Sequence, residues 1–210
     1  MTSYKKHNLY LLISLLGPIL FSLGLYIYNN IPNLDYSILK LIINSRSAGL
    51  TELSFICSWL GSGCITTFTI IVASILCLKK RWYYLTEMVL SVILSTSSCA
   101  MLKALIMRPR PLYLGFDALV DEPFFSFPSG HTTGSAAFTL AFLIVFWQTP
   151  LKLSYKITCT VLGALFMLSV AWSRLYNGVH FPSDIIGSFG LATFFCFATL
   201  YAVESLRKQN

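Results

Sequence analysis

The chain has 210 residues, of which 56% are hydrophobic and 11% are charged, and its mean hydropathy is +0.71. Soluble domains carry about 25% charged residues, so the composition excludes an ordinary soluble protein. It indicates one integral membrane domain over residues 1–210. The net charge of +7 would suggest nucleic-acid binding in a soluble chain. In a membrane protein, basic residues instead flank the spans on the cytoplasmic side, and we expect no nucleic-acid partner.

The first apolar run extends from Asn8 to Tyr28 and follows Lys5, Lys6 and His7. A basic start before an apolar run is also typical of a signal peptide. This run is longer than the roughly 7–15 apolar residues of a signal peptide, and no convincing small-residue cleavage site follows it. We therefore expect an uncleaved transmembrane helix.

Five further apolar runs follow, and each approaches the length of about 20 residues that crosses a bilayer. Because lipid offers no partners to backbone polar groups, these runs should be helices. Pro109 favours a helix end just before it, and the mixed stretch 29–52 could hold a short interfacial helix of unassigned role. The sequence predicts an all-α bundle of six transmembrane helices, the later five at 53–78, 83–107, 130–147, 157–172 and 182–204.

The distribution of basic residues predicts that both termini are cytoplasmic. With the N-terminus inside, the cytoplasmic side holds nine of the 15 Lys and Arg residues: Lys5, Lys6, Lys79, Lys80, Arg81, Lys152, Lys156, Arg207 and Lys208. The outer side holds the other six: Lys40, Arg46, Lys103, Arg108, Arg110 and Arg174. Several of these outer charges call for an explanation other than topology.

Three polar patches share the outer side, because six alternating spans place the loops after the third and fifth spans on one face. Lys103 and Arg110 lie around the end of the third span, and Arg174 lies just after the fifth. Three cations without a matching cluster of acids favour an anionic ligand, and the planar guanidinium of Arg suits phosphate oxygens.

The tetrapeptide PSGH, residues 128–131, adds a second anion-binding element at the start of the fourth span. Ser129 can cap that helix, whose first backbone N–H groups then point outward. A helix N-terminus carries about half a positive charge, which favours phosphate. Gly130 lets the backbone approach a ligand closely.

His180 and Asp184 are four residues apart at the start of the sixth span. An acid in the first helical turn can hold one imidazole nitrogen as N–H, which leaves the other nitrogen free as a nucleophile or base. His131 lies at the start of the fourth span, where it could protonate a leaving oxygen. Together with the cations, these groups are a complete set for phosphoryl transfer through a phosphohistidine.

Three motifs carry a family resemblance: K-x6-R-P from Lys103, P-S-G-H from Pro128, and S-R-x5-H-x3-D from Ser173. Together they resemble the signature motifs of the type 2 phosphatidic acid phosphatase superfamily, the lipid phosphate phosphatases, in its bacterial integral membrane branch. All three motifs lie within residues 103–184, and the match extends over about 53–204.

The resemblance implies a fold, an activity and residue roles. His180 would be the nucleophile, Asp184 its partner and His131 the general acid. The phosphate would be held by five residues: Lys103, Arg110, Ser129, Gly130 and Arg174. It implies a metal-independent phosphatase without a cofactor, in a bacterial inner membrane with the site facing the periplasm or exterior. Its substrate would be a phosphorylated membrane lipid of the phosphatidylglycerophosphate, undecaprenyl-diphosphate or phosphatidic acid type.

Other functions remain open at this stage. A lipid A phosphatase would share the motifs, and a peroxidase with a similar anion pocket is a remote alternative. A transporter or a non-catalytic phospholipid-binding protein could use the cations alone. A transporter tends to carry ionisable residues in mid-span, and this chain has almost none there: Glu87 lies near the cytoplasmic end of the third span. A non-catalytic relative is expected to lose His180 or His131, and the chain has both.

Several further residues are assigned structural roles. Arg108 lies outside the motif pattern and is expected to contact lipid headgroups. The six cysteines lie in or beside apolar runs without a Cys-x-x-Cys pair and are expected to be buried free thiols. An interfacial aromatic belt would comprise Tyr113, Phe116, Phe124, Phe125 and Phe127.

Overall fold

The computed structural model describes residues 3–209 and the side chains of residues 7–207. Over this range the chain is helical, with no strand, so the prediction of an all-α protein is confirmed. The helices are α1 (Ser3–Asn30), α2 (Pro32–Asn44), α3 (Ala48–Leu60), α4 (Gly63–Leu78), α5 (Trp82–Ile106), α6 (Gly130–Trp147), α7 (Leu153–Tyr176) and α8 (Pro182–Gln209), with a 3₁₀ turn η1 (Pro111–Leu114) after α5.

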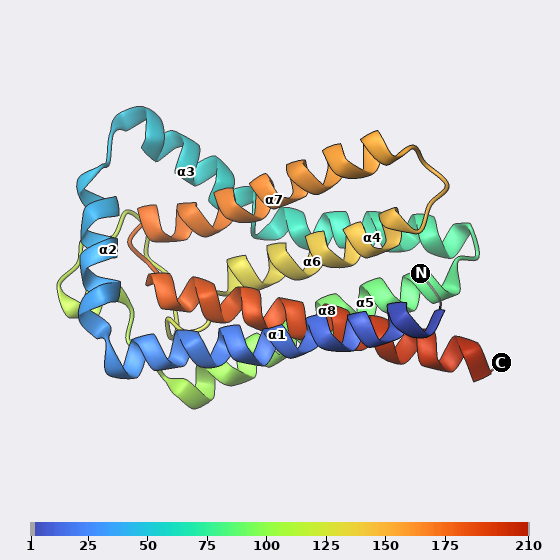
Figure 1. The fold of residues 1–210 in the computed structure, drawn as a ribbon. Helices are drawn as coiled ribbons and strands as arrows, with labels where there is room; N and C mark the ends of the chain where they lie inside the picture. Colours follow the sequence, from blue (N-terminus) through green and yellow to red (C-terminus); the bar gives the residue numbers. More distant parts are fainter. Residues whose placement is uncertain (1–2, 210) are drawn as a thin grey trace.

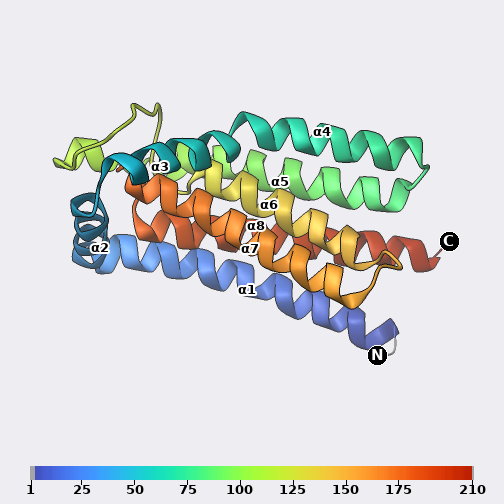
Figure 2. The same cartoon turned by 90° about the horizontal axis from the view of Figure 1, so that it is seen from above.

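Five helices are long and apolar enough to cross a membrane, namely α1, α5, α6, α7 and α8, and the bent pair of α3 and α4 is a sixth candidate span. The long helices run roughly alongside one another, with connecting loops at the two ends of the bundle (Figures 1 and 2). The chain is an integral membrane protein with five to six candidate spans.

The second predicted span, 53–78, is wrong as one continuous helix. α3 ends at Leu60 and α4 begins at Gly63, with a bend of 40° between them. A Cβ at Gly61 would lie 2.4 Å from Val170 Cγ1, so the glycine lets the end of α3 approach α7 closely. Because glycine disfavours a helix interior by about 1 kcal/mol relative to alanine, the run Gly-Ser-Gly weakens the helix at this contact.

The remaining helix limits agree with the sequence to different degrees. α5 and α6 match the predicted ranges 83–107 and 130–147 to within one residue. α7 is longer than the predicted 157–172, since it begins at Leu153 and ends at Tyr176. Hydropathy places a helix end at the first polar residues, whereas the backbone hydrogen bonds of α7 continue through them.

The stretch 29–52 contains the expected short helix. α2 follows α1 with Pro32 at its first turn, where proline fits a helix. It lies across the end of the bundle, steeply inclined to the long helices (Figure 1), and contacts α7 and α8. Its Asp35 and Leu39 are fully buried. Asp35, a charged residue of this segment, therefore points into the protein.

α1 packs along α8 (Figure 1), and glycine residues allow the two helices to approach closely. A Cβ at Gly17 would lie 2.6 Å from the carbonyl oxygen of Gly190 and 2.5 Å from the Cβ of Phe194. Small residues at such contacts let helix backbones approach, which drives helix association in membranes. The α1–α8 pair thereby positions the start of α8, where two predicted catalytic residues lie.

All six cysteines are free, as predicted. Cys57, Cys99 and Cys196 are buried, but Cys77 is exposed on α4, so the prediction of burial is wrong for that residue. The face of α4 that carries Cys77 is open because α4 lies at the edge of the bundle (Figure 2).

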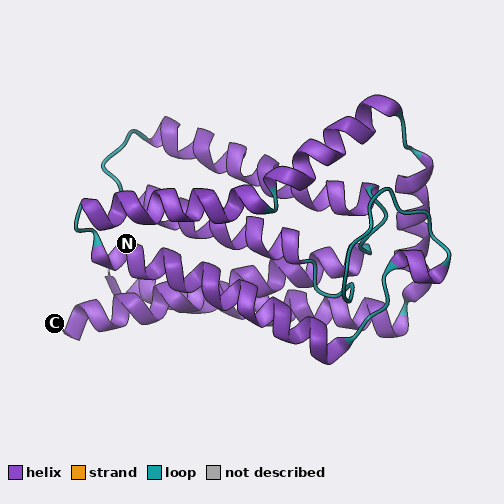
Figure 3. Ribbon diagram, turned by 180° about the vertical axis from the view of Figure 1, so that it is seen from behind, coloured by secondary structure: helices purple, strands orange, loops and turns teal. Residues whose placement is uncertain are grey.

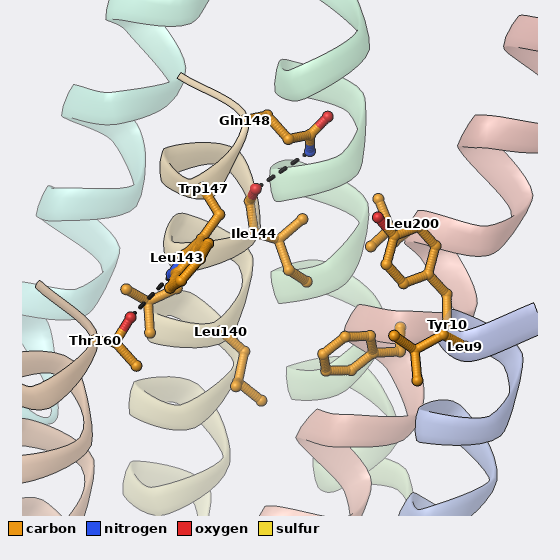
Figure 4. Close-up of a pocket in the computed structure, with 10 residues that line it drawn as sticks. Leu9, Tyr10, Leu140, Leu143, Ile144, Trp147, Gln148, Thr160 and Leu200 are labelled. Atoms are coloured by element: carbon orange, nitrogen blue, oxygen red, sulfur yellow. Dashed lines mark hydrogen bonds between the residues drawn. The ribbon is translucent and has the colours of Figure 1, made fainter. Parts of the chain in front are cut away.

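A cavity of about 400 Å³ opens near the end of the bundle that carries both termini (Figure 4). Its walls come from α1, α6, α7 and α8 and include Leu9, Leu143 and Leu200. The indole N–H of Trp147 donates to Thr160 Oγ1 at 2.9 Å within it. No carboxylate, imidazole or lysine is among its lining residues, so the chemistry predicted from the sequence does not lie here.

Candidate active site

The three predicted motifs meet at the opposite end of the bundle, beside α2. α5 ends there, α6 and α8 begin there, and α7 ends there. The long loop between α5 and α6 folds over the same end (Figure 3). Pro109 lies just beyond the helix end at Ile106, and Met107 closes the helix in a left-handed conformation with φ of 50°. The convergence expected from helix parity is thus present in the structure.

His180 and Asp184 form the expected pair. His180 Nδ1 lies 3.2 Å from Asp184 Oδ2, and both residues are buried. The same oxygen accepts the backbone N–H of Phe181 at 2.8 Å, which fixes the carboxylate at the N-terminus of α8. Ser126 in the loop also donates its hydroxyl to Asp184 Oδ2. A carboxylate held this way keeps Nδ1 protonated, so Nε2 carries the lone pair.

The environment of His180 favours the neutral imidazole. Burial lowers the pKa of His180 well below its ordinary value, and the nearby cations Lys103, Arg110 and Arg174 lower it further. Its Nε2 lies 3.4 Å from the NH1 group of Arg110. Neutral Nε2 therefore faces a guanidinium that can hold an anion beside it, the geometry that attack on a phosphate requires.

Two of the predicted phosphate-binding cations are held by carbonyl groups of the loop. Arg110 donates to the carbonyl oxygens of Pro123 at 2.8 Å and Phe124 at 3.0 Å. Lys103 donates through Nζ to the carbonyl oxygens of Phe125 at 2.7 Å and Ser126 at 3.2 Å. These bonds orient both side chains without neutralising them, so their positive charge remains available to an anion.

The PSGH motif forms the predicted helix start. Ser129 is the N-cap of α6, where its hydroxyl accepts the backbone N–H of Thr132 at 3.5 Å. The Ser129 backbone N–H donates to the hydroxyl of Ser188 on α8 at 2.8 Å, which ties the two helix starts together. A Cβ at Gly130 would meet no protein atom within 4 Å. Gly130, which precedes His131 at the start of α6, thus leaves space for a ligand.

Comparison with known proteins identifies the family. Residues 80–208 match the PAP2 superfamily. The chain belongs to the PAP2 superfamily. This range contains all three motifs but not α1, α2, α3 or α4.

Two similar proteins align with the chain, one over nearly its whole length and one over a shorter part. The chain is 28% identical over 200 residues to phosphatidylglycerophosphatase B of Bacillus subtilis. The aligned region covers 91% of this chain and 92% of the relative. The chain is 35% identical over 80 residues to a putative undecaprenyl-diphosphatase, YbjG, of Escherichia coli, over 38% of this chain and 36% of the relative. These relatives support the function predicted from the sequence, that of a membrane lipid phosphatase.

Two solved structures share the fold. The crystal structure of a transmembrane PAP2-type phosphatidylglycerolphosphate phosphatase from Bacillus subtilis aligns with a TM-score of 0.77 at 25% identity, over 95% of this chain and 96% of that one. The structure of Aquifex aeolicus LpxE aligns with a TM-score of 0.66 at 24% identity, over 80% of this chain and 94% of that one. The second likeness concerns the fold alone.

Glu122 is a residue of this PAP2 site that the sequence did not reveal. Its carboxylate forms an ion pair with Arg174 and lies 3.8 Å from Arg110. Burial raises the pKa of Glu122, but the nearby Arg174, His131 and Arg110 outweigh that effect and hold the pKa below its ordinary value. A carboxylate is therefore bound where two predicted phosphate-binding arginines meet. In the sequence Glu122 is one of two adjacent acids in a polar loop, which is typical of a solvated surface.

Arg108 corrects a prediction. It does not face headgroups but is buried with an exposed fraction of 1%. Its guanidinium forms ion pairs with Asp184 Oδ1 at 2.5 Å and Asp35 Oδ2 at 2.7 Å. Buried charges require partners, and these partners come from helices distant in sequence, which local pattern does not reveal.

The aromatic belt is also only partly correct. Tyr113 and Phe124 are exposed by 73% and 80%, as expected of interfacial residues. Phe127 is fully buried instead, with its ring against Phe21 of α1. Phe116 packs edge-on to Phe181, next to His180. Phe116 and Phe127 thus anchor the loop to residues beside the site and on α1, and Phe125 is half-buried.

Proposed function

We propose that this protein hydrolyses the phosphate or diphosphate headgroup of a membrane lipid through a phosphohistidine on His180. The observation that carries the proposal is the buried His180–Asp184 pair, whose free Nε2 faces Arg110. Phosphatidylglycerophosphate is the first substrate to test, because phosphatidylglycerophosphatase B of Bacillus subtilis aligns over nearly the whole chain. Undecaprenyl diphosphate, phosphatidic acid and a lipid A phosphate are the alternatives.

In the first step, Nε2 of His180 attacks phosphorus and the bond from phosphorus to the lipid oxygen breaks. His131 donates its proton to that oxygen, so the lipid leaves as an alcohol, or as a monophosphate if the substrate is a diphosphate. Lys103, Arg110, Arg174 and the N-terminus of α6 with Ser129 and Gly130 stabilise the phosphoryl oxygens. Asp184 holds Nδ1–H and stabilises the positive imidazole ring.

In the second step, water attacks phosphorus and the phosphorus–nitrogen bond breaks. His131, now neutral, takes the proton from the water, and Nε2 of His180 regains its lone pair. Inorganic phosphate leaves the site. Each histidine thus returns to its starting state after one turnover, and no step requires a cofactor or metal.

The experiment is phosphate release by the purified protein in detergent with EDTA, offered the four lipids. Release from one lipid that is lost in His180→Ala would support both the reaction and the substrate. A folded protein that binds phospholipid but releases no phosphate from any of them would favour the alternative function, that of a non-catalytic phospholipid-binding or transport protein.

The proposed placement is a bacterial inner membrane, crossed six times by a single domain, with both termini cytoplasmic and the site on the outer face. The excess of Lys and Arg at the end with the termini supports this orientation. A reporter enzyme that is active only in the periplasm, fused after Asn210, should stay inactive. Activity of that fusion would show that the C-terminus lies outside and that the orientation is the opposite one.

Glu122→Gln should lower the KM for the lipid substrate about fivefold, an interaction of about 1 kcal/mol. The substrate phosphate must displace the Glu122 carboxylate from Arg174, and the amide keeps a hydrogen-bond acceptor without the negative charge. Steady-state kinetics and vanadate inhibition measure the effect. Asp121→Asn, an exposed neighbour in the loop, is the matched control with little change. A raised KM for Glu122→Gln would show instead that Glu122 is needed to position Arg174.

The pH profile of kcat/KM should retain activity as pH falls through 6.5. The nucleophile must be neutral, and the pKa of His180 is lowered well below that value by burial and by the cations. Protonation of Nε2, and with it the acidic loss of activity, should therefore occur only at lower pH. Phosphate release over a pH series with one lipid checks this. An acidic limb centred at or above 6.5 would contradict the proposed environment of His180.

A further inference from the structure

Arg108 joins two buried carboxylates that come from opposite ends of the sequence. Its NH2 group donates to Asp35 of α2 at 2.7 Å, and its NH1 group donates to Asp184 of α8 at 2.5 Å. The guanidinium lies 4.3 Å from the ring centre of Tyr28 and 4.2 Å from that of Phe181. Aromatic ring faces at these distances attract a cation. The two rings therefore help to fix the position of Arg108, in addition to its ion pairs.

Asp35 is equally well bound. Its exposed fraction is 0%. Oδ1 accepts the backbone N–H of Ser183 at 2.9 Å, and Oδ2 accepts both Arg108 and the Ser183 hydroxyl. Ser183 directly precedes Asp184 at the start of α8. The carboxylate of Asp35 therefore contacts Arg108, which also binds Asp184, and the backbone of Ser183 next to Asp184.

The two oxygens of Asp184 have separate tasks. Oδ1 faces Arg108, whereas Oδ2 faces His180 Nδ1, Ser126 and the backbone N–H of Phe181. The three ionised groups Asp35, Arg108 and Asp184 together carry one net negative charge. That charge is available to the imidazole of His180. Without Asp35, Arg108 would pair with Asp184 alone, and this remaining pair would be neutral.

We propose that Asp35 of α2 is a positioning residue for the nucleophile, which acts on His180 through Arg108 and Asp184. Because Arg108 pairs with Asp35 as well as with Asp184, its positive charge does not fully neutralise Asp184. Asp184 therefore keeps the negative charge needed to hold Nδ1–H and to stabilise the phosphohistidine. This inference rests on the proposed function. It places α2, which lies outside the residues matched to the PAP2 superfamily, in the catalytic apparatus.

The test is Asp35→Asn in the full-length protein, assayed for phosphate release with the lipid on which the wild type is active. We expect kcat to fall about 10- to 100-fold, with KM within about threefold of wild type, since Asp35 does not touch the phosphate-binding groups. Asp117→Asn is the matched control. It removes an ion pair with Arg46 that also ties the segment after α2 to the loop, but it leaves Asp184 untouched, and its kcat should stay near that of wild type.

A double-mutant cycle separates positioning from stability. If Asp35 acts through Asp184, Asp35→Asn should have little further effect on kcat in an Asp184→Asn background. If Asp35→Asn does not fold, Arg108→Lys provides the same test, because a single ammonium cannot bridge both carboxylates as the guanidinium does. It should show the same loss of kcat.

Three results would overturn the inference: a wild-type kcat in Asp35→Asn, an equal loss in Asp117→Asn, or a full additional loss in the Asp184→Asn background. All three presuppose an active wild type. An inactive wild type with every lipid would instead count against the proposed function itself, so the two failures are distinguishable.

Discussion

His180→Ala should reduce phosphate release by about 10⁴-fold or more, because the covalent route requires the imidazole nitrogen and loss of a nucleophile is among the largest single-residue effects in enzymes. Release from lipid in detergent, followed over long incubations, measures the residual rate. The chain has three histidines, and His7 is the matched control. It lies at the opposite end of the bundle, stacked on Tyr201 at 3.9 Å, and His7→Ala should keep normal activity.

Trapping the intermediate makes this result specific to mechanism. Wild-type protein quenched during turnover of a ³²P-labelled lipid should carry acid-labile label, and His180→Ala should carry none. A His131→Ala variant should still acquire label from a substrate with a good leaving group, because only proton transfer is impaired. Substantial turnover by a folded His180→Ala variant would mean that another group attacks phosphorus.

The sequence was sufficient to bring together the residues that we propose act on the phosphate. Lys103, Arg110, Arg174, His131 and His180 lie in short motifs whose spacing reflects local geometry, such as a helix end or a first helical turn. Helix parity then placed these motifs at one end of the bundle, where the structure has them. Contacts formed within four residues, such as that between His180 and Asp184, are visible in one sequence.

The residues that support the site were not predictable in this way. Asp35 lies 73 residues from Arg108 and 148 from Ser183, and a single acid near a helix start is typical of a solvated position. Glu122 and Ser126 belong to a loop without periodicity. Their roles depend on how the loop folds over the bundle, which is determined by buried side chains such as Phe127.

The break between α3 and α4 escaped prediction for a related reason. Hydropathy averages over a window, and the residues around Gly61 are apolar enough to continue a span. At the bend, Gly61 lies close against Val170 on α7, a tertiary contact that hydropathy does not reveal. The hydroxyl oxygen of Ser58, one turn before the break, accepts the NH1 group of Arg174, so the bent segment also contacts a predicted phosphate-binding residue.

Asp184→Asn should lower kcat by about 10³- to 10⁴-fold while KM and vanadate binding stay near the wild-type values. Asparagine matches the shape of aspartate, but its amide carries no charge and can donate to Nδ1. It would thereby favour the imidazole tautomer whose Nε2 bears the proton and cannot attack. The proposed phosphate-binding groups Lys103 and Arg110 are not among the hydrogen-bond partners of Asp184, so substrate affinity should be retained.

The variant must be compared with wild type in thermal unfolding as well as in turnover, because Asp184 also accepts Arg108 and the N–H of Phe181. Arg108 keeps one carboxylate, Asp35, in the variant, so the buried cation stays paired and the fold should persist. A kcat within about threefold of wild type would show that His180 needs no acid partner. A large rise in KM with unchanged kcat would place Asp184 in substrate binding instead.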